Sequence, residues 1–241
     1  MIKFFKIFLL LCLNVSVFSY TPGKWSPMDK NLMGYERFGP KEEVVKNSEG
    51  KIVYTARYEY NEEGKLIKET YTNSEGKEDG RTLYDYVNGK LNSEEIHDQN
   101  GLQERRVFKY SFNGELKEII LYGTGGEEKQ RCKVVHMKEE LITEAVIRWK
   151  EHKETEYFNM KKDPNENVWV QDIMDEKKKN MGTVRYIFDD SGKLIRRENV
   201  QNSYRRASEI KYDSSGKIIE FSYSVLDAGN WKVLKTHHLV Y

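Results

Sequence analysis

Cysteine and long apolar runs are scarce in this 241-residue chain, and each shortage excludes a class of protein. Of the two cysteines, Cys12 lies in the N-terminal apolar segment, which leaves Cys132 without a partner for an internal disulfide. A Cys/His zinc pattern and a CxxC redox motif are excluded for the same reason. Beyond residue 19, no apolar run approaches the ~20 residues of a membrane-spanning helix. The sequence therefore predicts neither a disulfide-rich domain nor a transmembrane segment after the leader.

The one long apolar run lies at the N-terminus and has the form of a signal peptide. Lys3 and Lys6 precede the apolar residues 7–13, and Val-Phe-Ser at residues 17–19 resembles a signal-peptidase site. We therefore expect residues 1–19 to be a signal peptide and the protein to reach the periplasm, the cell surface or the extracellular space. A lipoprotein anchored through Cys12 is the alternative, because Leu-Leu-Leu-Cys loosely resembles a lipobox.

The mature chain also lacks an excess of charge of either sign. Two of the 40 basic residues leave with the leader, so 38 remain against 39 acidic residues, and the net charge is near −1. This balance gives no electrostatic reason to expect nucleic acid as a partner. Hydrophobic residues make up 38%, yet 16 Tyr and 10 Phe exclude wholesale disorder. The composition favours a thin architecture that buries strips of side chains.

A repeat with a period of about 25 residues organises most of the chain. The first series of turn glycines is Gly64, Gly89, Gly114, Gly192 and Gly216, and the second series, between them, is Gly76, Gly101 and Gly126. Each repeat therefore holds two turns and two short segments. We expect residues 45–241 to form the repeat domain. Residues 20–44 hold three of the four prolines and no repeat signature, which predicts an irregular N-terminal cap.

The segments between the turns have the period-two pattern of strands. Aromatic residues alternate with charged ones, which puts the aromatics on one face of a sheet. This aromatic ladder consists of Tyr58, Tyr60, Tyr84, Tyr86, Phe108, Tyr110, Tyr186, Phe188 and Tyr212. The fold class is therefore all-β: tandem antiparallel hairpins in a continuous, twisted or curled meander sheet. A helix over residues 139–148 is an alternative to a degenerate repeat there.

The repeat units resemble a known family. The stretches 58–66, 186–194 and 210–218 are similar to YD or RHS-type repeats. They read Tyr-x-Tyr-Asn-x-x-Gly-Lys-Leu, Tyr-x-Phe-Asp-x-x-Gly-Lys-Leu and Ile-x-Tyr-Asp-x-x-Gly-Lys-Ile. The stretch 84–116 is similar to MORN-like repeats, with Tyr-x-x-Asn-Gly-x-Leu units. The resemblance implies a small exported form without a toxin domain, built as a sheet of tandem hairpins, non-catalytic and with no assigned ligand.

The expected export, the β-rich pattern and the final Tyr241 are features that an outer-membrane barrel would also have. Such a barrel needs alternate apolar residues facing lipid. Counted at period two, Lys65-Leu66-Ile67-Lys68-Glu69 puts charge on both faces in the middle of a strand. We therefore expect no membrane barrel, and whether the sheet is open or closed depends on turn geometry.

No residue pattern predicts catalysis, a cofactor or a metal. The histidines do not form a metal-binding spacing, and His237 and His238, adjacent on a strand, must point to opposite faces. Cys132 is expected to be a buried structural thiol.

Binding or scaffolding is the predicted function. The aromatic ladder is expected to be a core strip, or in part an exposed face that stacks against a glycan or peptide. A free sheet edge that pairs with a protein partner is a further possibility. The alternatives are an enzyme with a site in the degenerate residues 132–176, and an accessory or immunity-like partner of a larger exported protein.

Overall fold

The computed structural model describes residues 39–241 except 139–140, 152–154, 164–165 and 202–203. The expected signal peptide, Cys12 and most of the expected cap lie outside the described residues. The strands are β1 (Glu42–Asn47), β2 (Ile52–Tyr60), β3 (Leu66–Asn73), β4 (Glu78–Val87), β5 (Lys90–Asp98), β6 (Gly101–Tyr110), β7 (Leu116–Tyr122), β8 (Glu128–Lys138), β9 (Leu141–Trp149), β10 (Thr155–Lys162), β11 (Val168–Met174), β12 (Asn180–Phe188), β13 (Leu194–Gln201), β14 (Tyr204–Tyr212), β15 (Ile218–Asp227) and β16 (Asn230–Val240). Strand β1 begins within the segment 20–44 that was expected to be irregular.

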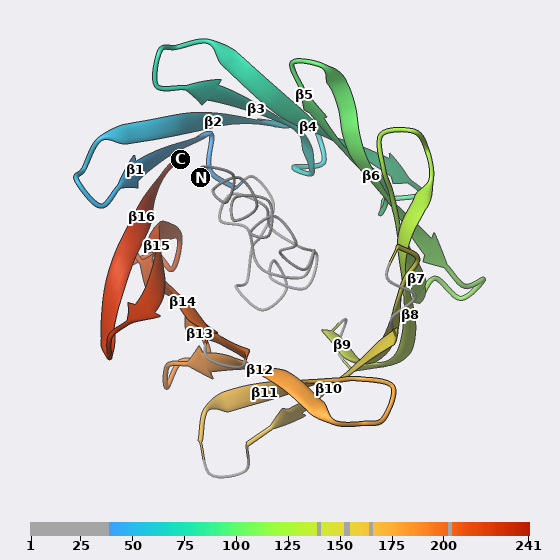
Figure 1. Cartoon of the computed structure of the whole chain (residues 1–241). Coiled ribbons are helices and arrows are strands. Elements are labelled where there is room, and N and C mark those ends of the chain that lie inside the picture. The colour runs from blue at the N-terminus through green and yellow to red at the C-terminus, as the bar shows by residue number, and fades with distance from the viewer. Residues whose placement is uncertain (1–38, 139–140, 152–154, 164–165, 202–203) are drawn as a thin grey trace, which may run out of the picture.

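The strands form one closed sheet (Figure 1). Each strand pairs antiparallel with its neighbours in the sequence, and β1 pairs with β16, so that 16 strands complete a barrel. The prediction of tandem antiparallel hairpins is confirmed, whereas the expected twisted or curled meander is corrected, because the sheet closes into a barrel. Closure pairs both edges of the sheet, which also removes the sheet edge as a place for a partner strand. A helix over residues 139–148 was the alternative; the described part of that segment belongs to strand β9.

The turns have the geometry that the sequence predicts. Asn88 and Gly89 have φ angles of 50° and 75°, as a two-residue type I′ hairpin requires. In the longer turns, a side-chain oxygen accepts backbone N–H groups: Asp213 Oδ1 accepts from Ser215 and Lys217, both at 2.9 Å. These side chains hold the turn closed through their own backbone.

A β-bulge lies after the first strand residue that follows each turn of the first series, and it changes which charged residues face outward. Tyr60 lies opposite Leu66, but Glu59 lies opposite Lys68, so Ile67 is one extra residue in β3. The bulge moves Lys68 to the outer face and Glu69 to the inner face, whereas a period-two count does the reverse. Equivalent register shifts occur in the hairpins β4–β5, β6–β7, β12–β13 and β14–β15. Because bulges bend and twist a strand, their repetition favours curling of the sheet into a barrel.

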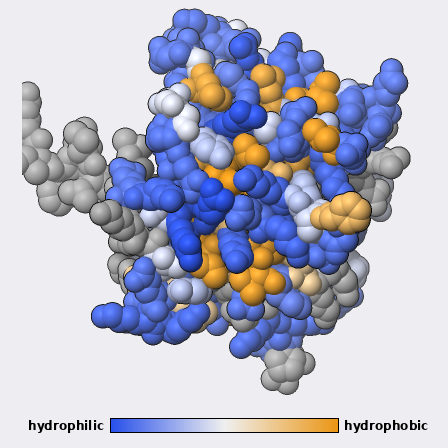
Figure 2. All heavy atoms as spheres, turned by 90° about the vertical axis from the view of Figure 1, so that its right-hand side faces the viewer, coloured by the Kyte–Doolittle hydropathy of each residue, from blue (hydrophilic) through white to orange (hydrophobic). Residues whose placement is uncertain are grey.

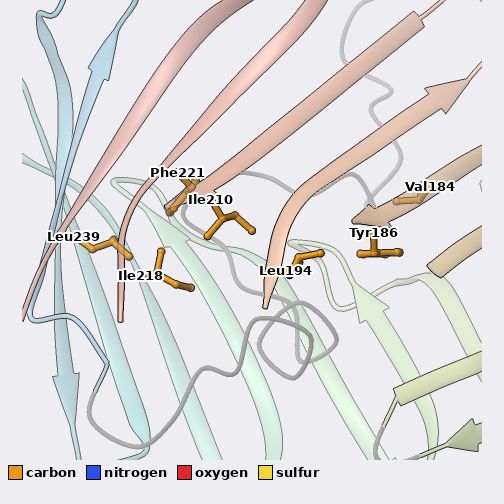
Figure 3. Close-up of a cluster of buried hydrophobic side chains, with 7 residues drawn as sticks. All are labelled: Val184, Tyr186, Leu194, Ile210, Ile218, Phe221 and Leu239. Carbon is orange, nitrogen blue, oxygen red and sulfur yellow. The ribbon is translucent and has the colours of Figure 1, made fainter. Parts of the chain in front are cut away.

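The two faces of the barrel wall differ in character. Side chains converge on the concave inner face, and the buried aromatic and aliphatic residues lie there in three separate clusters instead of one thick core. Figure 3 shows the largest cluster on strands β12–β16, where Tyr186 and Phe221 are fully buried. The outer face is mostly hydrophilic, with apolar residues between charged ones (Figure 2). Ile120 is an exception, since it is fully buried on the outer face.

Cys132 lies on the inner face of β8 and is buried, as the sequence predicted. Burial raises the pKa of its thiol from 9.0 to about 12, so the thiol stays protonated at neutral pH and is a poor nucleophile. We expect the folded protein to resist a thiol-alkylating reagent at mildly alkaline pH and to react fully once unfolded in denaturant. Mass spectrometry of the alkylated chain measures both states. Rapid alkylation of the folded protein would contradict the burial.

Candidate functional site

The aromatic ladder lies on the inner face and divides into two layers. The first aromatic of each pair is in the barrel wall: Tyr58, Tyr84, Phe108 and Tyr186 are all buried. The second aromatic lies two residues later, next to the turn at the rim of the barrel. The side chains at this position are half-buried or exposed: Tyr60, Tyr86, Tyr110, Phe188 and Tyr212. Tyr110 is the most open of the ladder, with 36% of its surface exposed. The structure therefore brings the predicted residues onto one face but leaves only the rim layer accessible.

The rim tyrosines connect successive repeats. Tyr86 Oη donates to the carbonyl of Leu66 at 2.9 Å, and Tyr212 Oη donates to that of Leu194 at 2.8 Å. Tyr110 and Tyr241 make the same bond to Leu91 and Ile218. In these four cases the leucine or isoleucine of the turn motif supplies a backbone acceptor to the tyrosine of the next repeat.

The lysine of the turn motif completes this contact, which we call the tyrosine latch. Lys193 Nζ lies 5.2 Å from the ring centre of Tyr212, and Lys217 Nζ lies 4.8 Å from that of Tyr241. Lys193 also packs against the next turn, where a Cβ on Gly216 would lie 2.9 Å from its Nζ. The latch explains the Gly-Lys-Leu spacing and places an ammonium group over one face of the Tyr86, Tyr110, Tyr212 and Tyr241 rings.

The latch tyrosines predict a specific alkaline transition. Burial raises the pKa of Tyr86, Tyr212 and Tyr241 from 10.0 to about 12. Below pH 10 these groups are protonated in both states, whereas between pH 10 and 12 the unfolded chain loses the protons first. We therefore expect the free energy of unfolding to fall as pH rises through this window. Tyrosinate absorbance against pH, followed with circular dichroism, would contradict this if most tyrosines ionised near pH 10 in the folded protein.

Further from the rim than the latches, the inner face has a buried layer in which tyrosine hydroxyls donate to carboxylate and amide groups. Tyr58 donates to Glu43, and Tyr84 Oη donates to Glu69 Oε1 at 2.6 Å. Tyr186 Oη donates to Gln171 Oε1 at 2.9 Å on the other side of the barrel. Burial, followed by the nearby carboxylates, raises the pKa of Tyr58 and Tyr84 well above 10.0, so both remain hydrogen-bond donors.

A transverse row of inner side chains continues this layer across strands β5–β9. Its members in register are Glu94, Arg106, Leu121, Gln130 and Trp149. Arg106 Nη1 lies 2.9 Å from Glu94 Oε2, and the Glu94 side chain is only 2% exposed. The buried carboxylate thus has its main compensation from one arginine. Sequence patterns did not reveal this row because the bulge in β5 disguises which face Glu94 occupies.

A groove of about 460 Å³ lies at the rim where the hairpins β4–β5 and β6–β7 meet. Apolar and polar side chains alternate around it, and its lining consists of Val87, Asn88, Lys90, Asn92, Phe108, Tyr110, Ser111, Phe112, Asn113 and Gly114. The groove therefore includes two ladder residues, Phe108 and Tyr110. It also includes Phe112, which is not part of the aromatic ladder.

Phe112 is the functional candidate that sequence reasoning missed. It is fully exposed at the tip of the β6–β7 turn. The equivalent position holds Glu62, Asp190 and Ser214 in other turns, so an aromatic residue replaces a polar one. That departure from the repeat was the available signal, because a large exposed apolar side chain at a turn tip contributes nothing to the core.

The remaining candidates do not converge on a reactive centre. His237 is buried on the inner face while His238 is on the outer face, as expected for adjacent strand residues. Among the residues that the structure describes, no group of His, Cys, Asp and Glu side chains is arranged to hold a metal ion. The segment 132–176, where an enzyme site was the alternative, contributes ordinary barrel strands, and the absence of catalysis stays a prediction.

Comparison with known proteins reveals the barrel in solved structures. No family model and no curated protein matches the sequence. A porin-like protein from Bacteroides uniformis ATCC 8492 superimposes with a TM-score of 0.54 and 10% identity, over 84% of this chain and 96% of that one. A porin-like protein from Bacteroides vulgatus ATCC 8482 gives a TM-score of 0.35 and 9% identity, over 85% and 98% of the two chains.

The first of these likenesses shows the fold. It overturns the resemblance to YD/RHS-type and MORN-like repeats, whose implied open sheet of hairpins does not occur here. The Tyr-x-Tyr-Asn-x-x-Gly-Lys-Leu spacing that suggested it arises instead from the bulges and tyrosine latches of a closed wall. In fold, the chain is a 16-stranded antiparallel β-barrel similar to a porin-like protein.

Proposed function

We propose that this protein is an exported, non-catalytic binding module. It is a β-barrel whose outer wall faces water and that binds its ligand in the rim groove. The expected signal peptide supports export, and the groove, with its exposed Phe112, supports binding. The alternative of an exported scaffold without a ligand uses the same wall but leaves the groove and Phe112 unexplained.

The charged outer wall is the observation that carries the proposal. Ion pairs join neighbouring strands in the middle of the wall, as between Arg105 and Glu95 at 3.4 Å and between Arg185 and Glu198 at 3.9 Å. A further pair lies nearer the turn, where Lys68 is 2.8 Å from Glu59. Arg131 bridges Glu118 on the neighbouring strand at 2.9 Å. In a membrane barrel these positions would face lipid, where a single Arg or Lys at the bilayer centre costs roughly 2–4 kcal/mol. An outer wall built from such pairs favours water.

The likeness to a porin-like protein favours a second candidate, an outer-membrane channel. A channel needs an apolar band around the outside of the barrel. Exposed apolar residues do occur on this chain, among them Ile195 at 37% and Ile219 at 41% exposure. These two residues are the extra residues of bulges beside the turns, and each is followed by a charged residue, Arg196 or Glu220. The exposed apolar residues thus form no such band among the described strands. No helix in the described part of the chain is long and apolar enough to cross a membrane.

Solubility and conductance distinguish the two candidates. The full-length sequence would be expressed with its own leader, and the exported protein purified without detergent. We expect a folded β-rich protein by circular dichroism, a single species in sedimentation, and no ion conductance when it is added to planar lipid bilayers. A protein that stays folded only in detergent and forms conducting pores would establish the channel and overturn the proposal.

A further inference from the structure

We infer that the rim groove binds a neutral saccharide chain, an inference that rests on the proposed binding function and names its ligand class. The groove has the volume of a small-molecule site, since such sites run from about 300 to 1,000 Å³. Its lining combines aromatic rings with side chains that both donate and accept hydrogen bonds. Sugars combine an apolar ring face with hydroxyl groups of the same double character.

The polar lining is composed of amides and a hydroxyl. Asn88, Asn92 and Asn113 each offer an NH₂ donor and a carbonyl acceptor, and Ser111 offers a hydroxyl. Internal bonds already orient part of this set: Asn92 Nδ2 donates to Asp85 Oδ2 at 2.7 Å, and Ser111 donates to Asn113. Such oriented amides suit neutral hydroxyl groups, which also donate and accept.

The charge in the groove disfavours an anionic ligand. Lys90 is the one basic residue of the lining, and its ammonium group donates to the carbonyl of Gly114 and lies 5.3 Å from the ring centre of Tyr110. The lysine is thus engaged in a tyrosine latch. No arginine in the lining offers the paired donors that carboxylate or phosphate recognition favours.

The aromatic side chains supply the stacking surface. Phe112 is fully exposed, so both faces of its ring are open to a ligand. Tyr110 is 36% exposed and its hydroxyl is fixed by the bond to Leu91. A rigid ring beside an open one presents a surface against which the apolar face of a pyranose can lie.

A protein partner fits the same place less well. A stable protein interface buries about 800 Å² on each side around an apolar centre. Here the apolar centre would consist of Phe112 and part of Tyr110, surrounded by amides. Strand pairing is also closed to a partner, because both neighbours of every described strand are occupied.

Calorimetry with soluble hexasaccharides tests the inference. The probes are cellohexaose, chitohexaose and mannohexaose, with hexagalacturonate as the anionic comparison. We expect saturable binding of at least one neutral probe, weakened about tenfold by Phe112→Ala and retained by Phe112→Trp, since stacking on one aromatic is worth roughly that factor. Val233→Ala, which shortens an apolar side chain that is exposed outside the groove, is the matched control and should bind as the parent does.

Each outcome has a definite reading. Binding of no neutral probe, binding of hexagalacturonate alone, or binding unaffected by Phe112→Ala in a protein whose circular dichroism is unchanged would overturn the saccharide assignment. A peptide library captured through Phe112 in the absence of sugar binding would overturn it in favour of a peptide ligand. If the protein is soluble without detergent, these failures leave the water-exposed barrel intact, whereas a requirement for detergent removes both proposals.

Discussion

Replacing Arg106 with methionine is expected to lower the free energy of unfolding by about 3–5 kcal/mol, because it leaves a buried carboxylate without its charged partner. Glu94 is almost fully enclosed, and Arg106 Nη1 binds its Oε2 at 2.9 Å. Methionine preserves much of the side-chain volume, so the loss measures the charge and not a cavity. Equilibrium unfolding in urea, followed by circular dichroism, gives the change.

The matched experiment also removes the charge of the Glu94 carboxylate. In the double variant Arg106→Met with Glu94→Gln, the buried group is neutral, and we expect recovery of a large part of the lost stability. If Arg106→Met alone unfolds at the same urea concentration as the parent, the pair does not hold the inner wall together.

Replacing His237 with phenylalanine is the second change with a large expected effect, because it acts where the barrel closes. His237 on β16 binds Glu43 on β1, and both side chains have no exposed surface. The histidine ring also stacks on Phe221, with 4.2 Å between ring centres. Phenylalanine preserves the stacking but leaves Glu43 with Tyr58 as its remaining bonded partner in the seam. We expect a loss of about 3 kcal/mol in the free energy of unfolding.

The neighbouring residue supplies the control. His238→Phe changes the same ring on the outer face, where the side chain is 39% exposed, and should alter stability by less than about 0.5 kcal/mol. Hydrogen exchange adds a local measurement: in His237→Phe the amides of residues 42–47 and 235–240 should lose protection before the rest of the wall. Uniform loss of protection around the barrel would contradict a weakened seam.

The strands and turns could be predicted because their signals are local. Asn88-Gly89 fixes a two-residue hairpin through its φ angles, and the alternation around Tyr84 and Tyr86 fixes one face of a strand. Closure could not be predicted in the same way. It depends on the extra residue at Ile67 and its equivalents, which reverses the faces of Lys68 and Glu69 and curls the sheet. A period-two count places charge on both faces of the bulged strand. It therefore argues against a membrane barrel but does not decide whether the sheet closes.

The candidate site was predictable in part for a similar reason. The shared face of the aromatic ladder follows from strand periodicity alone. Which rings are accessible depends on the lysine of the preceding repeat and on the carbonyl that each hydroxyl finds, and both are contacts between residues about 20 apart in sequence. Phe112 lies in a turn, outside any periodic pattern, so its importance emerges only when its exposure and its place beside Tyr110 are known.

The seam between β1 and β16 has a consequence for the order of the chain. The amide of Lys41 donates to the carbonyl of Val240 at 2.6 Å, so the start and the end of the wall lie side by side. In a ring of equivalent hairpins, no strand has to come first. A short peptide joining Tyr241 to residue 39, with new ends opened at the turn around Gly126, would give a circular permutant with the same neighbours for every strand. The fold thus depends on the pairing of strands around the ring, and more than one order of strands along the chain gives the same pairing.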